Sequence, residues 1–112
     1  MTTSGEPLPK RGEVWWARLD TRRPVVVVQT DALGDPRVRT FLAVPLTSRL
    51  HLEGLPGTVR LERTATGLPK PSVANVYDVQ KVLRSDFLER AGRLPNETLA
   101  GVAAGLRLVL GL

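Results

Sequence analysis

Four consecutive valines, Val25 to Val28, constrain the fold of this 112-residue chain more than any other feature. All four are branched at Cβ, which favours an extended backbone, and the run is too short for a typical helix. The run therefore predicts a strand buried on both faces. Pro24 begins this strand where no ladder hydrogen bond is lost, and Arg23 stands at its mouth.

A second apolar run, Thr40 to Val44, predicts another strand, which we expect to end at Pro45. Thr47 and Ser48 then follow the end of that strand. If the two strands are antiparallel neighbours, the start of the first and the end of the second lie together. The spacing thus brings the guanidinium of Arg23 and two hydroxyls to one place, which suggests a phosphate site.

The remaining pattern predicts several short strands. Residues Glu13 to Leu19 alternate and should form a hairpin with the valine strand, and Val59 to Leu61 predicts a half-exposed strand. Ser72 to Val82 predicts one bent strand or two. A helical turn is expected from Ser85 to Arg90, and a short strand at Gly92 to Leu94. Together these elements indicate a mainly β, α+β domain built on a bent antiparallel sheet or small barrel.

The last part of the chain predicts an amphipathic helix that Gly111 ends. Apolar residues recur at i, i+3, i+4 and i+7, namely Leu99, Val102, Ala103, Leu106, Val109 and Leu110. Gly101 and Gly105 weaken the helix but permit close approach of another backbone. The apolar stripe must be covered by the sheet or by a partner, and we expect a homodimer.

Composition narrows the class of protein. The chain has 16 Lys and Arg against 11 Asp and Glu, a net charge of +5 and a pI near 10.7, which favours a polyanionic partner. No cysteine is present, which excludes disulfides and thiolate metal sites. No apolar run reaches the length of a membrane span, so we expect a cytoplasmic protein. Residues 1–9 are expected to form a flexible tail before a single domain of residues 10–112.

Two segments resemble the MazF/PemK family of toxin endoribonucleases, also called mRNA interferases. They are Arg23-Pro24-Val25-Val26-Val27 and Val44-Pro45-Leu46-Thr47-Ser48, with Arg11 to Trp15 before them and Gly105 to Leu110 after them. The resemblance covers roughly residues 10 to 112. It implies an SH3-like barrel, the role of toxin in a type II toxin-antitoxin system, a cognate antitoxin as partner, and cleavage of single-stranded RNA. It also implies that Arg23 and Thr47 carry out the cleavage.

The residues themselves fit metal-independent cleavage by the neighbouring 2'-hydroxyl, which leaves a 2',3'-cyclic phosphate and a 5'-hydroxyl. Arg23 can stabilise the pentavalent dianion with two parallel N–H groups, and Thr47 adds a neutral donor. A single histidine, His51, excludes a two-histidine mechanism. No carboxylate cluster has metal-ligand spacing, so neither a metal nor a cofactor is expected. Water or one of the carboxylates of Glu13, Asp20 and Asp78 could accept the proton.

Further candidates for RNA contact are Trp16, Arg18, Arg22, Ser48, Tyr77 and Asp78. Aromatic rings stack on unpaired bases, although Trp15 and Phe41 are expected to pack in the core. The chain departs from the family in the short connection of Asp20 to Arg22, in Tyr77-Asp78 before the sixth strand, and in Arg18, where relatives often look acidic. These departures should alter which nucleotides are accepted.

Three alternatives stay open. Arg23 could be a surface guanidinium paired with Asp20, and Thr47 an ordinary turn hydroxyl. The chain could also be a gyrase poison like CcdB, although such poisons use a C-terminal tryptophan and this chain ends in Leu-Gly-Leu. It could finally be a catalytically silent relative that binds RNA or an antitoxin. The antitoxin is expected to be acidic and partly disordered.

Overall fold

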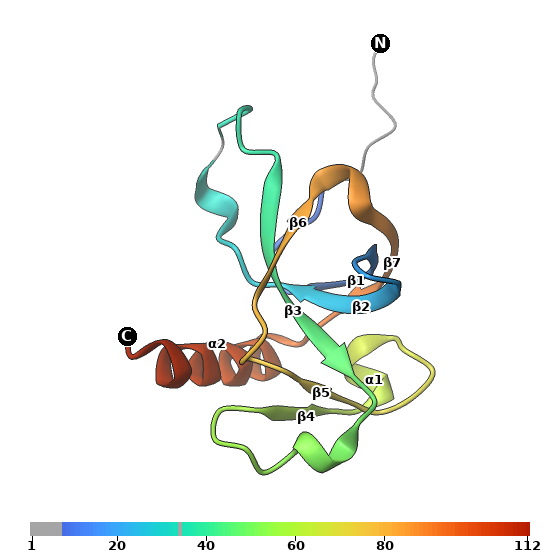
Figure 1. The fold of residues 1–112 in the computed structure, drawn as a ribbon, viewed down its shortest axis with the longest axis vertical. Helices are drawn as coiled ribbons and strands as arrows, with labels where there is room; N and C mark the ends of the chain where they lie inside the picture. Colours follow the sequence, from blue (N-terminus) through green and yellow to red (C-terminus); the bar gives the residue numbers. More distant parts are fainter. Residues whose placement is uncertain (1–7, 34) are drawn as a thin grey trace.

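The computed structural model describes residues 8–33 and 35–112, so most of the expected tail at residues 1–9 lies outside it. The described residues form seven strands, two α-helices and three short 3-10 turns (Figure 1). The strands are β1 (Glu13–Arg18), β2 (Arg22–Val27), β3 (Thr40–Thr47), β4 (Val59–Leu61), β5 (Ser72–Ala74), β6 (Gln80–Leu83) and β7 (Phe87–Arg93). The helices are α1 (Arg63–Thr66) and α2 (Asn96–Leu110), and the turns are η1 (Asp31–Leu33), η2 (Leu50–Leu52) and η3 (Arg84–Asp86).

The sheet is a strongly bent antiparallel half-barrel. Its strand order is β4-β5-β3-β2-β1-β7, and β6 pairs with the first half of β3. The long strand β3 therefore has three partners, and Figure 1 shows it running through most of the length of the molecule. The expected class, mainly β with a C-terminal helix, is confirmed. Of the two alternatives expected for Ser72 to Val82, one bent strand or two, the structure has two strands, β5 and β6.

The strand expected at the valine run forms as β2. It begins at Arg22, before the first valine, and ends at Val27. Val25, Val26 and Val27 are buried, and β2 pairs with β1 as a hairpin. Pro24 lies inside β2 and not at its first residue, because pairing with β1 continues back to Arg22.

The expectation that the next strand ends at Pro45 is wrong, because β3 continues to Thr47. Pro45 is the last residue of β3 that pairs with β2, and Leu46 and Thr47 pair with β5 instead. The change of partner thus occurs at a residue that has no N–H to donate. The carbonyl of Pro45 accepts a hydrogen bond from the backbone N–H of Asn75 at 3.0 Å.

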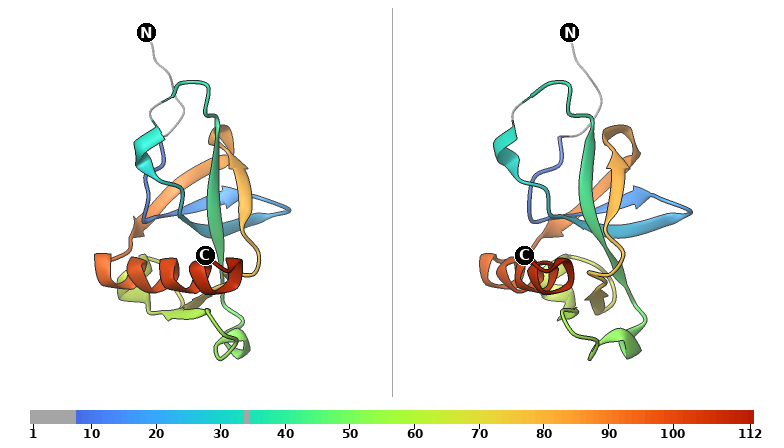
Figure 2. Two further views of the ribbon diagram at one scale, coloured as in Figure 1. Left: turned by 90° about the vertical axis from the view of Figure 1, so that its left-hand side faces the viewer. Right: turned by 60° about the vertical axis from the view of Figure 1, so that its left-hand side comes forward.

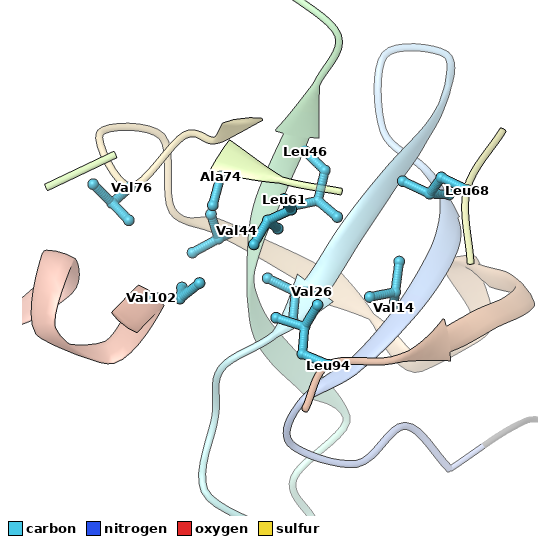
Figure 3. Packing of buried hydrophobic residues seen from close by; sticks show 10 residues of the cluster. All are labelled: Val14, Val26, Val44, Leu46, Leu61, Leu68, Ala74, Val76, Leu94 and Val102. Carbon is cyan, nitrogen blue, oxygen red and sulfur yellow. The ribbon is translucent and has the colours of Figure 1, made fainter. Parts of the chain in front are cut away.

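Both faces of the β1–β2 hairpin are buried, which explains why its sequence is apolar at successive positions. One face contributes to a core cluster of Val14, Val26, Val44, Leu46, Leu61, Leu68, Ala74, Val76, Leu94 and Val102 (Figure 3). The other face packs Trp15, Ala17, Val25, Val27, Ala43, Val82 and Phe87 together with Phe41. Phe87 makes edge contacts with Trp15 and Phe41, at centroid distances of 5.9 and 5.7 Å. The expected core positions of Trp15 and Phe41 are therefore confirmed.

Helix α2 forms where the periodicity predicts it and ends at Gly111. Most of its apolar stripe is covered by the sheet of the same chain: Val102 is buried in the core, and Leu99, Leu106 and Val109 pack against that core, whereas Leu110 is exposed. Figure 3 shows Val102 pointing toward Val44 and Val26, and the two views of Figure 2 show α2 lying across the sheet. The part of the stripe that the sheet covers therefore gives no argument for a second copy of the chain.

Close backbone contact fixes α2 in this position. A Cβ atom at Gly105 would lie 2.0 Å from the carbonyl oxygen of Gly57, so only glycine fits there. At Gly101 the nearest atom, from Val59, is 4.0 Å away. The expectation that the helical glycines admit another backbone is thus met at Gly105.

The helical turn expected from Ser85 to Arg90 is wrong. A 3-10 turn covers only Arg84–Asp86, and β7 begins at Phe87 and continues to Arg93. Pairing with β1 imposes the extended backbone, because β1 would otherwise expose an open edge, and burial of Phe87 anchors the strand. Among the described residues, no helix has the length and apolarity needed to cross a membrane.

Candidate functional site

The β1–β2 turn, the end of β3 and the segments flanking β5 line an open groove of about 690 Å³. We call it the groove; besides apolar residues it is lined by Trp16, Asp20, Arg22, Arg23, Thr47, Ser48, Arg49, Lys70, Ser72, Asn75, Asp78 and Gln80. Four of these side chains are cationic and two are anionic. The groove therefore carries a net positive charge, which suits a polyanionic ligand.

Arg23 and Thr47 lie in the groove together, as the strand ends predict. The pairs Val25↔Pro45 and Val26↔Val44 set the register of β2 against β3. That pairing ends at Val25 and Pro45, so Arg23 lies two residues before the last paired residue of β2 and Thr47 two residues after its partner in β3, where β3 pairs with β5. The antiparallel arrangement thus explains why a guanidinium and a hydroxyl line the same groove.

The hydroxyl of Thr47 is available as a donor. Its oxygen accepts a hydrogen bond from the backbone N–H of Arg49 at 3.1 Å. A hydroxyl that accepts through its oxygen still has its hydrogen to give. Thr47 can therefore donate to an anion bound in the groove.

Arg23 is paired with Asp20 and lines the groove at the same time. The carboxylate of Asp20 accepts from Nε at 2.7 Å and from Nη2 at 3.1 Å. These hydrogen bonds to Arg23, with the backbone N–H of Thr21, lower the pKa of Asp20 from 3.8 to about 2, and they raise the pKa of Arg23. The expected surface pairing and the expected phosphate site are thus compatible.

Trp16 and Arg22 form one wall of the groove. The guanidinium carbon of Arg22 lies 4.9 Å from the centroid of the Trp16 ring, and Nη2 of Arg22 donates to Glu89 at 2.7 Å. The arginine therefore stacks on the aromatic face that could otherwise receive a base. A base can stack on the guanidinium plane or take its place.

Ser48 and Asp78 also line the groove. The carboxylate of Asp78 accepts a hydrogen bond from the amide of Gln80 at 2.7 Å. The backbone N–H of Tyr77 donates to the side chain of Asn75 at 3.3 Å, which holds the turn between β5 and β6. Asp78 thus presents a carboxylate to the groove beside an amide group.

Arg18 and Tyr77 do not line the groove. Arg18 forms an ion pair with Asp86 at 3.8 Å, and the hydroxyl of Tyr77 donates to the carbonyl of Pro56 at 2.6 Å. The arrangement therefore gives no support for RNA contact by these two residues.

The carboxylates considered as proton acceptors differ in their surroundings. Glu13 lies outside the groove lining, where it is ion-paired with Arg90 and accepts a hydrogen bond from the Trp15 indole. Asp20 lies in the groove, but its lowered pKa makes it a weak base. Asp78 is the remaining groove carboxylate. His51 belongs to η2 and does not line the groove.

Sequence reasoning missed Arg49, Lys70, Asn75 and Gln80 as groove residues. Lys70 follows Pro69 in a loop, and Asn75 and Gln80 flank the turn after β5. No local pattern marks these residues, because tertiary packing alone brings their loops to the strand ends. Within the described ranges, 8–33 and 35–112, no group of three or more His, Asp or Glu could hold a metal ion.

Comparison with known proteins identifies the family of this chain. A family model described as PemK-like, MazF-like toxin of type II toxin-antitoxin system matches residues 10–110. Endoribonuclease MazF2 of Mycobacterium bovis and endoribonuclease MazF6 of Mycobacterium tuberculosis are each 37% identical over 110 residues, which is 91% of this chain and 96% of each relative.

Solved structures show the same architecture. The Mycobacterium tuberculosis toxin MazF-mt6 superposes with a TM-score of 0.78 at 23% identity, covering 89% of this chain and 97% of the toxin. The MazE-MazF structure from Deinococcus radiodurans gives a TM-score of 0.77 at 27% identity, covering 96% and 99%. The family model and the relatives thus place the chain in a class of small toxins, whose fold it shares. It belongs to the PemK-like, MazF-like toxin family of type II toxin-antitoxin systems.

Proposed function

We propose that this chain is the toxin of a type II toxin-antitoxin system and acts as an endoribonuclease on single-stranded RNA at a short sequence. Its relatives at 37% identity are named endoribonucleases, and their lengths match this chain almost completely. The observation that carries the proposal for this chain's own residues is the shared position of Arg23 and Thr47 in a positively charged groove.

In the proposed reaction, the 2'-hydroxyl oxygen of RNA attacks the adjacent phosphorus. A bond from phosphorus to the 2'-oxygen forms while the bond to the 5'-oxygen breaks. The 2'-hydroxyl gives up its proton to a base, and the departing 5'-oxygen takes up a proton. The products are a 2',3'-cyclic phosphate and a 5'-hydroxyl.

Arg23 and Thr47 act on the charge that develops at phosphorus. The guanidinium of Arg23 favours the dianionic transition state over the monoanionic ground state, since its attraction grows with the negative charge. The hydroxyl of Thr47 adds a neutral hydrogen bond to the same nonbridging oxygens. Because a fixed cation supplies this stabilisation, we propose that cleavage needs no divalent metal. Asp78 or a water molecule accepts the proton.

We propose that Trp16, Arg22, Ser48 and Asp78 contact the RNA on either side of the scissile phosphate, since all four line the groove. One solved structure with the same fold, from a mycobacterial species, is an endoribonuclease in complex with its cognate antitoxin. By analogy, an acidic and partly disordered antitoxin covers the groove of this chain. The homodimer expected from the sequence stays a prediction, since α2 packs on its own sheet. Sedimentation tests it, and a 12.2 kDa species alone would contradict it.

The proposal is tested by incubating a mixed-sequence RNA with the wild type and with Arg23→Ala in EDTA, and by mapping the new 5' ends. We expect cleavage at a recurring short sequence by the wild type, and a loss of about 100-fold or more in rate for Arg23→Ala. Arg37→Ala is the matched control, because Arg37 is an exposed arginine that pairs with Asp35 outside the groove.

Two further substrates sharpen the test. An RNA with a single 2'-deoxy nucleotide at the cleaved position should resist cutting, since it lacks the nucleophile. The product ends should be a cyclic phosphate and a 5'-hydroxyl. Cleavage of the deoxy substrate, or equal activity of Arg23→Ala and the wild type, would overturn the mechanism. Inhibition of a topoisomerase without RNA cleavage would favour the gyrase-poison alternative.

A further inference from the structure

We propose that Asp20 is a positioning residue for RNA cleavage, which holds one edge of the Arg23 guanidinium so that the opposite edge faces the scissile phosphate. The inference rests on the function proposed for Arg23. It assigns a role to the short connection between β1 and β2.

The connection itself fixes Asp20. The backbone N–H of Leu19 donates to the carbonyl of Thr21 at 2.9 Å, which closes the turn. The backbone N–H of Thr21 donates to Oδ1 of Asp20, also at 2.9 Å. The turn therefore holds the carboxylate of Asp20 independently of its contact with Arg23. A turn of this length leaves Asp20 only three residues from Arg23, at the entrance to β2.

The contact between Asp20 and Arg23 uses only part of the guanidinium. Asp20 accepts from Nε and Nη2, at 2.7 and 3.1 Å. A guanidinium carries five N–H donors in a fixed plane. The edge formed by Nη1 and the outer hydrogen of Nη2 is left to make two parallel hydrogen bonds. Such an edge matches two nonbridging oxygens of a phosphate, so Asp20 and the phosphate can bind Arg23 at the same time.

The exposure of this pair argues against a role in holding the fold together. The side chains of Arg23 and Asp20 are 53% and 68% exposed, and exposed ion pairs are strongly screened by water. Orientation is a different effect. An arginine side chain that is already held in one conformation loses less rotational freedom when the transition state forms. The pair therefore serves catalysis more than folding.

The charge of Asp20 has the opposite effect on binding. The lowered pKa keeps Asp20 ionised at neutral pH, so the groove carries one extra negative charge. That charge repels RNA phosphates and weakens attraction in the ground state. Removing Asp20 should thus lower KM and lower kcat together. Merely structural damage would not produce this split, because it would reduce binding and turnover alike.

The test compares the wild type with Asp20→Ala and Asp20→Asn on one cleavable RNA. We expect kcat to fall by about 10- to 100-fold in Asp20→Ala, with KM unchanged or lower. Asp20→Asn keeps an oxygen that can accept from Arg23 and should retain more of kcat. Asp35→Ala is the matched control, because Asp35 also accepts from Nε and Nη2 of an exposed arginine, Arg37, and lies outside the groove. It removes the same charge and should leave kcat unchanged.

A second measurement does not depend on cleavage. The Nε–H resonance of Arg23 should show restricted motion and slow exchange in the wild type and should lose both in Asp20→Ala. Binding of an RNA with a 2'-deoxy nucleotide at the cleaved position should leave this resonance restricted, because Asp20 stays in place. Displacement of Asp20 on binding, or an unchanged kcat with a lower KM in Asp20→Ala, would show that Asp20 only competes with RNA and would overturn the proposal. Failure of the wild type to cut any RNA would instead contradict the proposed function, while the resonance still reports on the pair.

Discussion

The guanidinium of Arg22 stacks on the indole ring of Trp16, 4.9 Å from its centroid. Trp16 is half-buried, whereas its neighbour Trp15 packs in the core on the other face of the hairpin. The two tryptophans of the chain therefore report on different regions. The fluorescence of Trp16 is sensitive to the groove, and that of Trp15 to the packing of the core.

RNA binding should change the fluorescence of Trp16. A base that stacks on Trp16 or on its arginine alters the surroundings of the indole. We expect a non-cleavable RNA to change the emission of the wild type and to have little effect on Trp16→Phe. Trp16→Ala should weaken RNA binding by about 1–3 kcal/mol, the usual contribution of one stacked base. Equal affinity of Trp16→Ala and the wild type would remove Trp16 from the binding site.

Loss of the Thr47 hydroxyl should reduce the rate of cleavage without unfolding the protein. Thr47→Val keeps the branched shape that suits the last residue of β3 but cannot donate to a phosphate oxygen. We expect kcat to fall by about 100- to 1000-fold. Thr47→Ser retains the hydroxyl and is the matched control. Similar kcat values for the valine and serine variants would show that the hydroxyl has no part in cleavage.

Asp78 should influence which nucleotide is accepted. A carboxylate repels phosphate, so its favourable contacts in the groove are with N–H groups on base edges. Asp78→Asn replaces one acceptor oxygen by a donor while keeping the shape. We expect a shift in the cleaved sequence, with discrimination altered by about 1–3 kcal/mol at one position. A large fall in kcat beside the shift would show that Asp78, and not water, accepts the proton. Sequencing of the cleaved 5' ends measures the shift. If Asp78→Asn cleaves the same RNA sequence at the same rate as the wild type, Asp78 does not contact the RNA.

The two glycines of α2 should respond in opposite directions to alanine. Gly105→Ala forces a Cβ against the carbonyl of Gly57 and should destabilise the protein by about 1–3 kcal/mol or more. Gly101→Ala meets only the side chain of Val59, at an ordinary contact distance of 4.0 Å, and should stabilise the protein by about 0.5–1 kcal/mol. Denaturant unfolding measures both. Equal effects of the two substitutions would contradict the close contact between the helix and the loop before β4.

The pair of Asp20 and Arg23 should be lost only in strong acid. The pKa of Asp20 is about 2 in the folded protein, below its ordinary value of 3.8. The ionised carboxylate therefore adds stability above pH 3.8, and this contribution decreases below pH 3.8 and is lost as the pH falls through 2. We expect wild type and Asp20→Asn to differ slightly in unfolding midpoint at pH 7 and to converge below pH 2. A difference as large at pH 2 as at pH 7 would contradict this assignment.

The local pattern of apolar residues was enough to predict the elements whose own side chains are buried. The valines of β2, the alternation of β1 and the stripe of α2 each carry their own signal. β7 does not, because none of its residues from Leu88 to Arg93 is buried, and they become extended only through pairing with β1. The continuation of β3 past Pro45 was missed for a related reason, since it depends on a change of pairing partner.

The residues of the candidate site also fall into two groups, those that local pattern predicts and those that it does not. Arg23 and Thr47 could be predicted because each stands at the end of a strand, and antiparallel pairing brings those ends together. Lys70, Asn75 and Gln80 could not, because they lie near β5 or in β6, and these strands reach the groove only by pairing with β3. Arg18 lies between the groove residues Trp16 and Asp20 in the sequence, but its side chain forms an ion pair with Asp86.

The position of β1 between β2 and β7 has a consequence for protein synthesis. β2 follows β1 at once, but the other edge of β1 pairs with residues 87–93. While the ribosome is still making the chain, β1 therefore has one neighbour and an open edge. The hairpin that carries Arg23 receives its full support only after residues 87–93 have left the exit tunnel. A prematurely terminated product that lacks β7 should consequently be harmless to the cell that made it.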